Sequence, residues 1–182
     1  MTNELRGAKR RFDVRRAAVG GVTILALLTI GALWQRAHPY SIETSTTIDA
    51  SPEEVWAVLT DFAAYDEWNP TLTGMTGDLR EGATLSFSND GMDFAPTVQR
   101  VEAPRLLRWE GHVGVVGVFD GEHTFTLEQQ DDGSTLFTQS ELFRGVAVLF
   151  MTDTLRDDTA PTFHAMNAAL RERVEGGLAD GR

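Results

Sequence analysis

Residues 121–145, GEHTFTLEQQDDGSTLFTQSELFRG, decide the fold of this chain. They form two long stretches of alternating polar and apolar residues, joined by an Asp132-Gly133 turn. Because successive side chains of a strand point to opposite sides, one face of the first stretch holds His123, Phe125 and Leu127. The corresponding face of the second stretch holds Phe137, Gln139, Glu141 and Phe143. A face that mixes large aromatics with an amide and a carboxylate is unusual for a packed core, so the pattern favours a sheet folded around a cavity.

A long apolar segment lies near the other end of the chain. Ala17 to Trp34 (AAVGGVTILALLTIGALW) is eighteen residues without a charge, close to the ~20 needed to cross a bilayer. The residues before it include Arg6, Lys9, Arg10, Arg11, Arg15 and Arg16, against only Glu4 and Asp13. Behind it, Arg36 is the sole nearby positive charge. The positive-inside rule therefore predicts a membrane anchor with its N-terminus in the cytoplasm.

Two alternatives to the anchor stay open, a cleaved signal peptide and a buried helix of a soluble protein. The apolar run exceeds the ~7–15 residues usual in signal peptides, and no Ala-x-Ala pair follows it cleanly. With the anchor, we expect a basic cytoplasmic tail (1–16), a transmembrane helix (17–34), one folded domain outside the cytoplasm (38–176) and a flexible tail (177–182).

Composition limits what that domain does. The first 36 residues hold seven of the 16 basic and two of the 27 acidic residues, so the remainder has 9 and 25 and a formal net charge of −16. Such an acidic surface should repel nucleic acid and anionic headgroups. The chain has no cysteine, which excludes disulfides, thiolate zinc sites and thiol nucleophiles. Its four histidines lack metal-site spacing, so we expect no metal and no cofactor.

The remaining elements follow from their signals. An alternating strand over Tyr40–Ile48 precedes a helix with Ser51 as N-cap, Pro52 in its first turn and Glu54 completing a capping box. A second short helical piece, Phe62 to Trp68, stops at Asn69-Pro70. Strands are then expected near 71–78, 83–88, 93–103, 105–114, 121–130 and 134–143. A last helix should end before Gly176-Gly177; because of Pro161, it is either long and kinked or begins near Thr159.

This order of elements resembles the START-related lipid-binding superfamily (SRPBCC), which includes the birch pollen allergen and bacterial polyketide cyclase/dehydrase-like proteins. IDASPEEVWAVLTDFAAYDEWNP (48–70) resembles the family's opening strand and helix pair, residues 122–145 its last two strands, and FHAMNAALRERVE (163–175) its closing helix. The resemblance implies an α+β helix-grip fold: a curved antiparallel β-sheet wrapped around a long C-terminal α-helix with a cavity between, here preceded by one transmembrane helix.

We expect this cavity to bind a hydrophobic small molecule or a lipid, because an aromatic lining with a few polar groups suits an apolar ligand with one polar end. The residues expected to contact it are Trp68, Asn69, Trp109, His123, Phe125, Phe137, Glu141, Phe143, Phe163 and Met166. Three points stay open. The aromatics could simply pack on one another, a slipped register would turn Trp109 outward, and the Trp68-Asn69-Pro70 segment could be a helix stop alone.

His123 and Glu141 are the candidates for proton transfer, because facing strands can bring an imidazole and a carboxylate together in a poorly solvated pocket. A polyketide cyclase-like enzyme, with these residues or Asn69 steering protons, is therefore the alternative to a binding protein. The sequence favours a structural role of the pair over catalysis, with Glu141 hydrogen-bonded to the backbone or to Arg144 and His123 a satisfied interior residue, so we assign no catalytic residue. A third possibility is a groove of the same fold that receives a protein partner.

Overall fold

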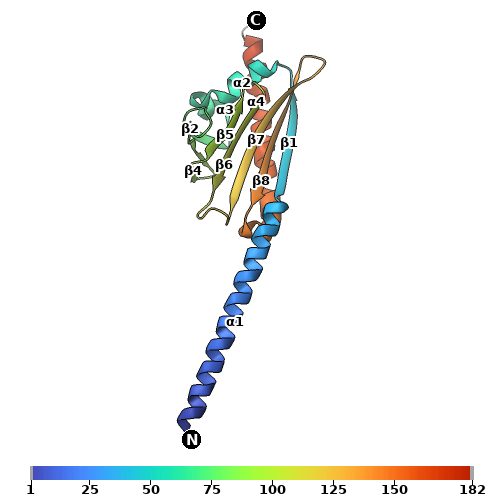
Figure 1. Cartoon of the computed structure of the whole chain (residues 1–182). Coiled ribbons are helices and arrows are strands. Elements are labelled where there is room, and N and C mark those ends of the chain that lie inside the picture. Colours follow the sequence, from blue (N-terminus) through green and yellow to red (C-terminus); the bar gives the residue numbers. More distant parts are fainter. Residues whose placement is uncertain (1, 181–182) are drawn as a thin grey trace.

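The structure is a computed structural model that describes the backbone of residues 2–180 and the side chains of residues 18–179. A curved antiparallel sheet packs against a long C-terminal helix, α4 (Thr152–Asp180), and a long N-terminal helix, α1 (Thr2–Ala37), projects from one end of this domain (Figure 1). The arrangement confirms the expected α+β helix-grip fold.

The main sheet has the strand order β1-β8-β7-β6-β5, and every neighbouring pair is antiparallel. Its strands are β1 (Tyr40–Ile48), β5 (Thr97–Glu102), β6 (Leu106–His112), β7 (Asp120–Gln129) and β8 (Thr135–Arg144). A smaller sheet contains β2 (Leu72–Thr76), β3 (Ser86–Asn89) and β4 (Met92–Phe94). The short helices are α2 (Pro52–Thr60), η1 (Phe62–Ala64) and α3 (Tyr65–Trp68), before β2, and η2 (Val146–Phe150), before α4.

The β7–β8 hairpin is the one that the alternating pattern predicts, and its register places His123 directly opposite Glu141. At the turn, Gly133 has φ +90°, a conformation that favours glycine. The carboxylate of Asp132 accepts hydrogen bonds from the hydroxyl (2.7 Å) and the backbone N–H (3.0 Å) of Ser134. These bonds, the hydroxyl bond most of all, hold the pKa of Asp132 below its ordinary value.

Helix α2 begins as its sequence predicts. The backbone N–H of Glu54 donates to Ser51 Oγ (3.4 Å), and the backbone N–H of Ser51 donates to Glu54 Oε2 (2.8 Å), which completes the capping box. Pro52 stands in the first turn, where no intrahelical N–H is needed. Val55 and Leu59 then face the core and are fully buried.

The middle strands differ from expectation in two places. The single strand expected over 93–103 is two strands, because Ala95 and Pro96 separate β4 from β5. Proline has no N–H to donate to a ladder, but its carbonyl still accepts from the N–H of Leu85 at 2.9 Å. The strand expected from residue 83 begins at Ser86, with only an isolated bridge at Thr84 before it.

Helix α4 is the longer of the two alternatives, since it begins at Thr152 and continues through Pro161. The expected stop before Gly176-Gly177 is wrong, and residues 177–180, expected to belong to a flexible tail, are helical. The physical reason lies on the buried face of the helix. Val174 is buried and Leu178, one turn later, packs against the same core, so tertiary contacts hold the helix across both glycines.

Two apolar clusters fill the domain. The larger one lies between the sheet, α2 and α4, and Phe125 and Phe137 are fully buried in it. The smaller one lies toward the α1 end and consists of Ile42, Phe143, Val148, Leu155 and Phe163. Phe163 thus joins α4 to the end of the sheet nearest to the N-terminal helix.

Within α1, the 20-residue stretch Ala18–Ala37 is on average apolar enough, and long enough, to cross a membrane, and nearly all of its residues are exposed. This segment is therefore not buried in the core of the domain. A signal sequence meets the same criteria of length and composition. The structure does not describe the side chains of the preceding basic residues, Arg6 to Arg16. Residues 181–182 of the expected tail also lie outside the described residues.

Candidate functional site

A buried polar group lies on the helix-facing side of the β7–β8 hairpin. His123 Nδ1 is 2.5 Å from Glu141 Oε2, and the two side chains are only 9% and 14% exposed. On the other side of the ring, the Gln139 side-chain amide donates to His123 Nε2 at 3.2 Å. In this arrangement the imidazole carries its proton on Nδ1, donates to the carboxylate and accepts from the amide. We call His123, Gln139 and Glu141 the polar triad.

Aromatic side chains enclose the imidazole of the polar triad. Trp109 of β6 stacks on it at a centroid distance of 5.1 Å and an interplanar angle of 16°. Phe163 of α4 meets it edge-on at 5.1 Å and 74°, and Phe125 lies at 4.5 Å. The expected register of Trp109 is therefore the observed one, since Trp109 pairs with His123 across β6 and β7. These surroundings exclude water from the hydrogen bond between the imidazole and the carboxylate, which strengthens that bond.

Gly121 makes room for the carboxylate of the polar triad. It precedes His123 by two positions on the same face of β7, and a Cβ built there would overlap Glu141 Oε1. Any larger residue at position 121 would push the carboxylate away from the imidazole. Sequence reasoning missed Gly121, because an isolated glycine in a strand signals a close approach without naming its partner.

Two polar residues in the space between sheet and helix have unpartnered buried oxygens. Gln139 Oε1 finds no donor among the described residues, although its amide nitrogen also lies 3.6 Å from Met166 Sδ. Asn167 of α4 donates to Thr44 Oγ1 at 2.9 Å, while its own Oδ1 has no partner in the part of the chain that the structure describes. An unpaired buried acceptor costs about 1–3 kcal/mol, so two of them beside an aromatic wall require a reason.

Gln139 and Asn167 were absent from the expected contact residues. Both had a signal in the sequence: Gln139 lies between Phe137 and Glu141 on the cavity face of β8, and Asn167 stands four residues after Phe163 on the buried face of α4. At these spacings a polar residue faces the interior.

The structure brings together most of the expected contact residues around the polar triad. Phe137 stacks on Phe125 at 5.7 Å, and Met166 reaches the triad through Gln139. Phe143 belongs instead to the smaller apolar cluster, with Phe163. These aromatics pack on one another, so the interior is closed in this conformation.

Trp68 and Asn69 lie apart from the polar triad, at the α3 end of the domain. Asn69 Oδ1 accepts from the backbone N–H groups of Thr71 (2.9 Å) and Leu72 (3.0 Å), so it closes the turn that leads into β2. Asn69 Nδ2 and Trp68 Nε1 are buried and have no hydrogen-bond partner within the described residues 18–179. Burial also raises the pKa of the neighbouring Tyr65 far above its usual value, so this phenol stays neutral and donates to the Leu59 carbonyl at 2.7 Å.

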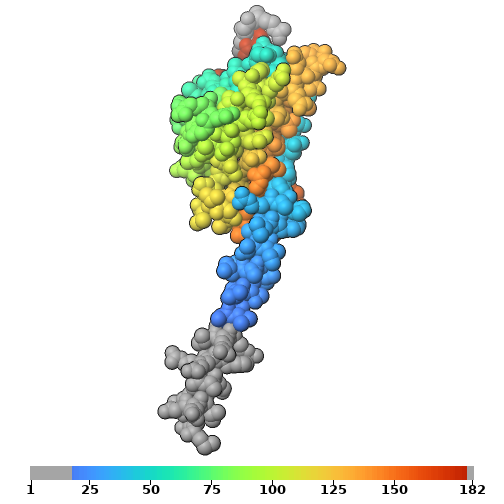
Figure 2. All heavy atoms as spheres, in the orientation of Figure 1, coloured from blue at the N-terminus to red at the C-terminus, as the bar shows by residue number. Residues whose placement is uncertain are grey.

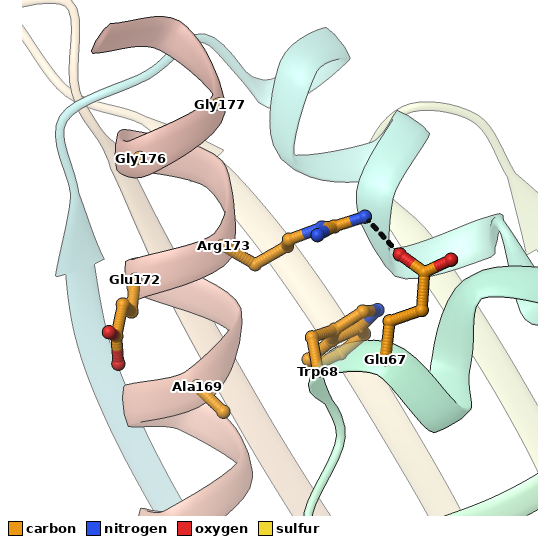
Figure 3. A pocket seen from close by; sticks show the side chains of 7 residues that line it. All are labelled: Glu67, Trp68, Ala169, Glu172, Arg173, Gly176 and Gly177. Carbon is orange, nitrogen blue, oxygen red and sulfur yellow. Dashed lines mark hydrogen bonds and ion pairs between the residues drawn. The ribbon is translucent and has the colours of Figure 1, made fainter. Parts of the chain in front are cut away.

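A surface hollow of about 490 Å³ lies beside Trp68, between α3 and α4. Figure 3 shows the Glu67–Arg173 ion pair (2.7 Å) closing over the indole, with Ala169 and Glu172 on the helix side. A second hollow lies at residues 129–132 of the β7–β8 hairpin. Neither is lined by a member of the polar triad. Among the described residues, no group of three or more His, Asp or Glu side chains is arranged to hold a metal ion.

Comparisons with known proteins agree with this architecture. A search of curated proteins gave no match. Among solved structures, a START superfamily protein from Mycobacterium smegmatis aligns over 75% of this chain and 97% of its own, with 21% identity and a TM-score of 0.58. A point mutant of norcoclaurine synthase from Thalictrum flavum, in complex with a transition-state analogue, aligns over 77% and 96% with 15% identity and a TM-score of 0.61. A hypothetical protein from Helicobacter pylori aligns over 74% and 87% with 14% identity and a TM-score of 0.64.

At these identities the solved structures establish the fold alone. The family model described as polyketide cyclase / dehydrase and lipid transport matches residues 39–175, which is nearly all of the chain after α1. This match shows that the chain belongs to the polyketide cyclase/dehydrase and lipid transport family.

Proposed function

We propose that this protein binds a hydrophobic small molecule or lipid between its sheet and α4, and that the polar triad recognises a polar group on that ligand. The observation that carries the proposal is the unpartnered oxygen of Gln139, buried beside an imidazole within an aromatic wall. A domain held together by packing alone gains nothing from that arrangement, because an apolar side chain would avoid the cost of the unpaired acceptor.

The chemistry of the wall defines the class of ligand. Trp109, Phe125 and Phe163 offer apolar ring faces, while Gln139 Oε1 offers a free acceptor. A ligand with an apolar body and one hydrogen-bond donor, such as a hydroxyl group, matches both features. Because the domain carries a formal charge of −16 after residue 36, a neutral ligand is favoured over an anionic one.

The closed interior must open for such a ligand. Phe163 and Met166 belong to α4 and form the helix side of the wall, so rotation of these side chains or a small shift of α4 makes the space. Met166 suits this role because its unbranched side chain has several rotamers of similar energy. In this proposal the ligand replaces packing contacts instead of filling a permanent hole.

We further propose that Ala18–Ala37 anchors the protein in a membrane, with the N-terminus in the cytoplasm and a domain of residues 38–176 outside it. The support is the length and apolarity of this helix and the excess of basic residues before it. Tethering would hold the domain close to ligands dissolved in the bilayer and raise their effective concentration.

A cyclase-like enzyme is the second candidate. The 2.5 Å contact between His123 Nδ1 and Glu141 Oε2 orients the imidazole so that Nε2 could exchange a proton with a substrate. That nitrogen is now bonded to Gln139 and buried, so catalysis would require the substrate to take the place of the amide. The binding role needs no such exchange and is preferred.

The binding proposal is tested by extracting what copurifies with the full chain. The chain and its Gln139→Leu variant are purified in the same mild detergent, and bound molecules are released by denaturation and identified by mass spectrometry. Gln99→Leu, on the exposed side of β5, is the matched control. We expect a discrete apolar compound in the wild type and control and at least a tenfold loss in Gln139→Leu. Equal amounts in all three proteins would refute the role of the triad.

A further inference from the structure

The end of the domain from which α1 projects carries exposed apolar side chains on two segments. The loop between β6 and β7 presents Val115 (71% exposed) and Val116 (68%), with Val113 and Val118 beside them. On η2, Phe150 is 81% exposed, and Met151 follows it. Large apolar side chains gathered in this way mark an interaction surface. We call residues 113–118 and 146–151 the apolar tip.

The two segments of the apolar tip form one surface. The backbone N–H of Ala147 donates to the Val118 carbonyl at 3.0 Å, and that of Val146 donates to the Gly117 carbonyl at 3.4 Å. Asp120 closes the loop by accepting from the backbone N–H of Gly117 with both oxygens, each at 2.9 Å. Residues 113–119 and 145–152 contain no charged side chain. The tip therefore carries no charge, and backbone hydrogen bonds join its two segments.

Helix α1 contacts the η2 segment of the apolar tip. A Cβ built on Gly31 would lie 3.1 Å from Leu149 Cδ1. Gly31 and Ala32 are partly buried and Gln35, one turn further on, is buried, whereas residues 18–30 are exposed. Figure 2 shows the helix leaving the domain at the same end as the β6–β7 loop. The contact with η2 thus lies inside the apolar stretch Ala18–Ala37 and not beyond it.

This contact sets the depth of the apolar tip in any bilayer that α1 crosses. Trp34, stacked on His38 at 4.9 Å, is the aromatic residue suited to the membrane–water interface. Gly31 lies three residues before Trp34, which places Leu149 about 5 Å deeper along the helix axis. Groups that bind in the interface are buried to about 5–10 Å. An aqueous position for η2 would require α1 to be withdrawn from the bilayer by a full turn.

We propose that the apolar tip is a second membrane contact, in which Phe150 and the valines of the β6–β7 loop insert into the headgroup–acyl boundary beside α1. This inference rests on the proposed anchoring of α1. The occupant is a lipid bilayer, since α1 continues from the tip into it, and neutral lipids suffice because the tip has no charge. Asp153 and Arg156, at the start of α4, pair with each other at 3.1 Å and mark where water begins.

Docking of the tip has a consequence for the ligand site. On β7, His123 stands three residues after Asp120, which accepts the hydrogen bonds that close the β6–β7 loop. On β8, Phe143 lies two residues before Gly145, which is in close contact with the Val118 carbonyl of the same loop. The end of the sheet that holds the polar triad is therefore the end that faces the bilayer. A ligand dissolved in the membrane would reach α4 and Phe163 from this end without crossing bulk water.

The test places an environment-sensitive fluorophore on single cysteines of the full chain in phosphatidylcholine vesicles, which is direct because the chain has none of its own. Val116→Cys and Phe150→Cys report on the apolar tip, Leu25→Cys on the anchor, and Asp131→Cys, in the hairpin at the far end of the domain, on water. We expect labels at 25, 116 and 150 to emit at shorter wavelength and to be quenched by spin-labelled lipid, while the label at 131 is not.

The labelled positions distinguish a failure of tip docking from a failure of the α1 anchor. A lipid-quenched label at 25 with water-exposed labels at 116 and 150 would leave the anchor intact and overturn the docking, as expected if the tip binds a protein instead. A water-exposed label at 25 would overturn both. Spin labels at different depths in the acyl chain should quench the label at 150 from the shallow position and the label at 25 from the deep one.

Discussion

Replacing Gly121 by alanine should dislodge the Glu141 carboxylate from His123. The added methyl group would overlap Glu141 Oε1; apart from the adjacent residues, the only other described atom within 4 Å of it is Glu141 Cδ at 3.5 Å. The strain therefore falls on one side chain, which can relieve it only by rotating away from the imidazole. The variant tests whether the short contact between His123 and Glu141 is a real and stabilising part of the fold.

The expected magnitude follows from the bond that is lost. A hydrogen bond to a charged group contributes about 1.5–3 kcal/mol, and the pair is shielded from water. Gly121→Ala should therefore lower the free energy of unfolding by about this amount. In a Glu141→Ala background the methyl group meets nothing, so the same change should cost under about 0.5 kcal/mol, and the difference is the coupling energy.

Urea unfolding of the full chain in mild detergent, followed by near-ultraviolet circular dichroism, measures these free energies. Gly111→Ala is the matched control, because Gly111 pairs with Gly121 across β6 and β7 and its added Cβ would lie an ordinary 3.4 Å from Pro96. Equal destabilisation by Gly121→Ala in both backgrounds would refute the reasoning, because the methyl would then act on something other than Glu141.

Three further predictions concern local structure, and urea unfolding checks each. Ser51→Ala removes the cap of α2 and should cost about 1 kcal/mol, whereas Ser45→Ala, on the exposed side of β1, should change stability little; equal effects would contradict the capping role. Asn69→Ala leaves the N–H groups before β2 without their acceptor and should cost about 1–3 kcal/mol; an unchanged midpoint would show that this turn needs no cap. Hydrogen bonds from Ser134 lower the folded pKa of Asp132, so their stabilisation is present above the unfolded pKa of about 3.9 and is lost as pH falls through the folded value. Ser134→Ala should therefore lower the midpoint at neutral pH and less in acid, and a pH-independent difference would argue against it.

Local signals in the sequence predicted much of the fold. The alternation in residues 121–145 defined the β7–β8 hairpin, and the capping box at Ser51 defined the start of α2. These elements are governed by interactions between residues close in sequence or across one turn. The predicted end of α4 was wrong because it depends on contacts between residues far apart in the sequence. Leu178 packs against residues far away in the chain and holds the helix across two glycines, and no local pattern reports such a contact.

The candidate site was predicted in part. Strand parity placed His123, Glu141 and Trp109 on one face, and the register shows them together. The alternation of side chains along a strand does not show how tightly a face is packed. The sequence therefore could not predict whether Phe125 and Phe137 line a cavity or stack on each other, as they do in the structure. The contact between α1 and η2 was equally out of reach, because it joins residues more than a hundred positions apart.

Binding of a ligand between the sheet and α4 is tested most directly by identifying what lies against Met166. Photoactivatable methionine, close to methionine in size, is incorporated into the full chain in cells, cross-linked by light and located by peptide mass spectrometry. Met75, buried away from the triad, and Met151, on the apolar tip, serve as internal controls. We predict a discrete small-molecule adduct on the Met166 peptide, none on the Met75 peptide and only bilayer lipids on the Met151 peptide. A Met166 peptide that cross-links solely to protein would contradict a ligand between the sheet and α4.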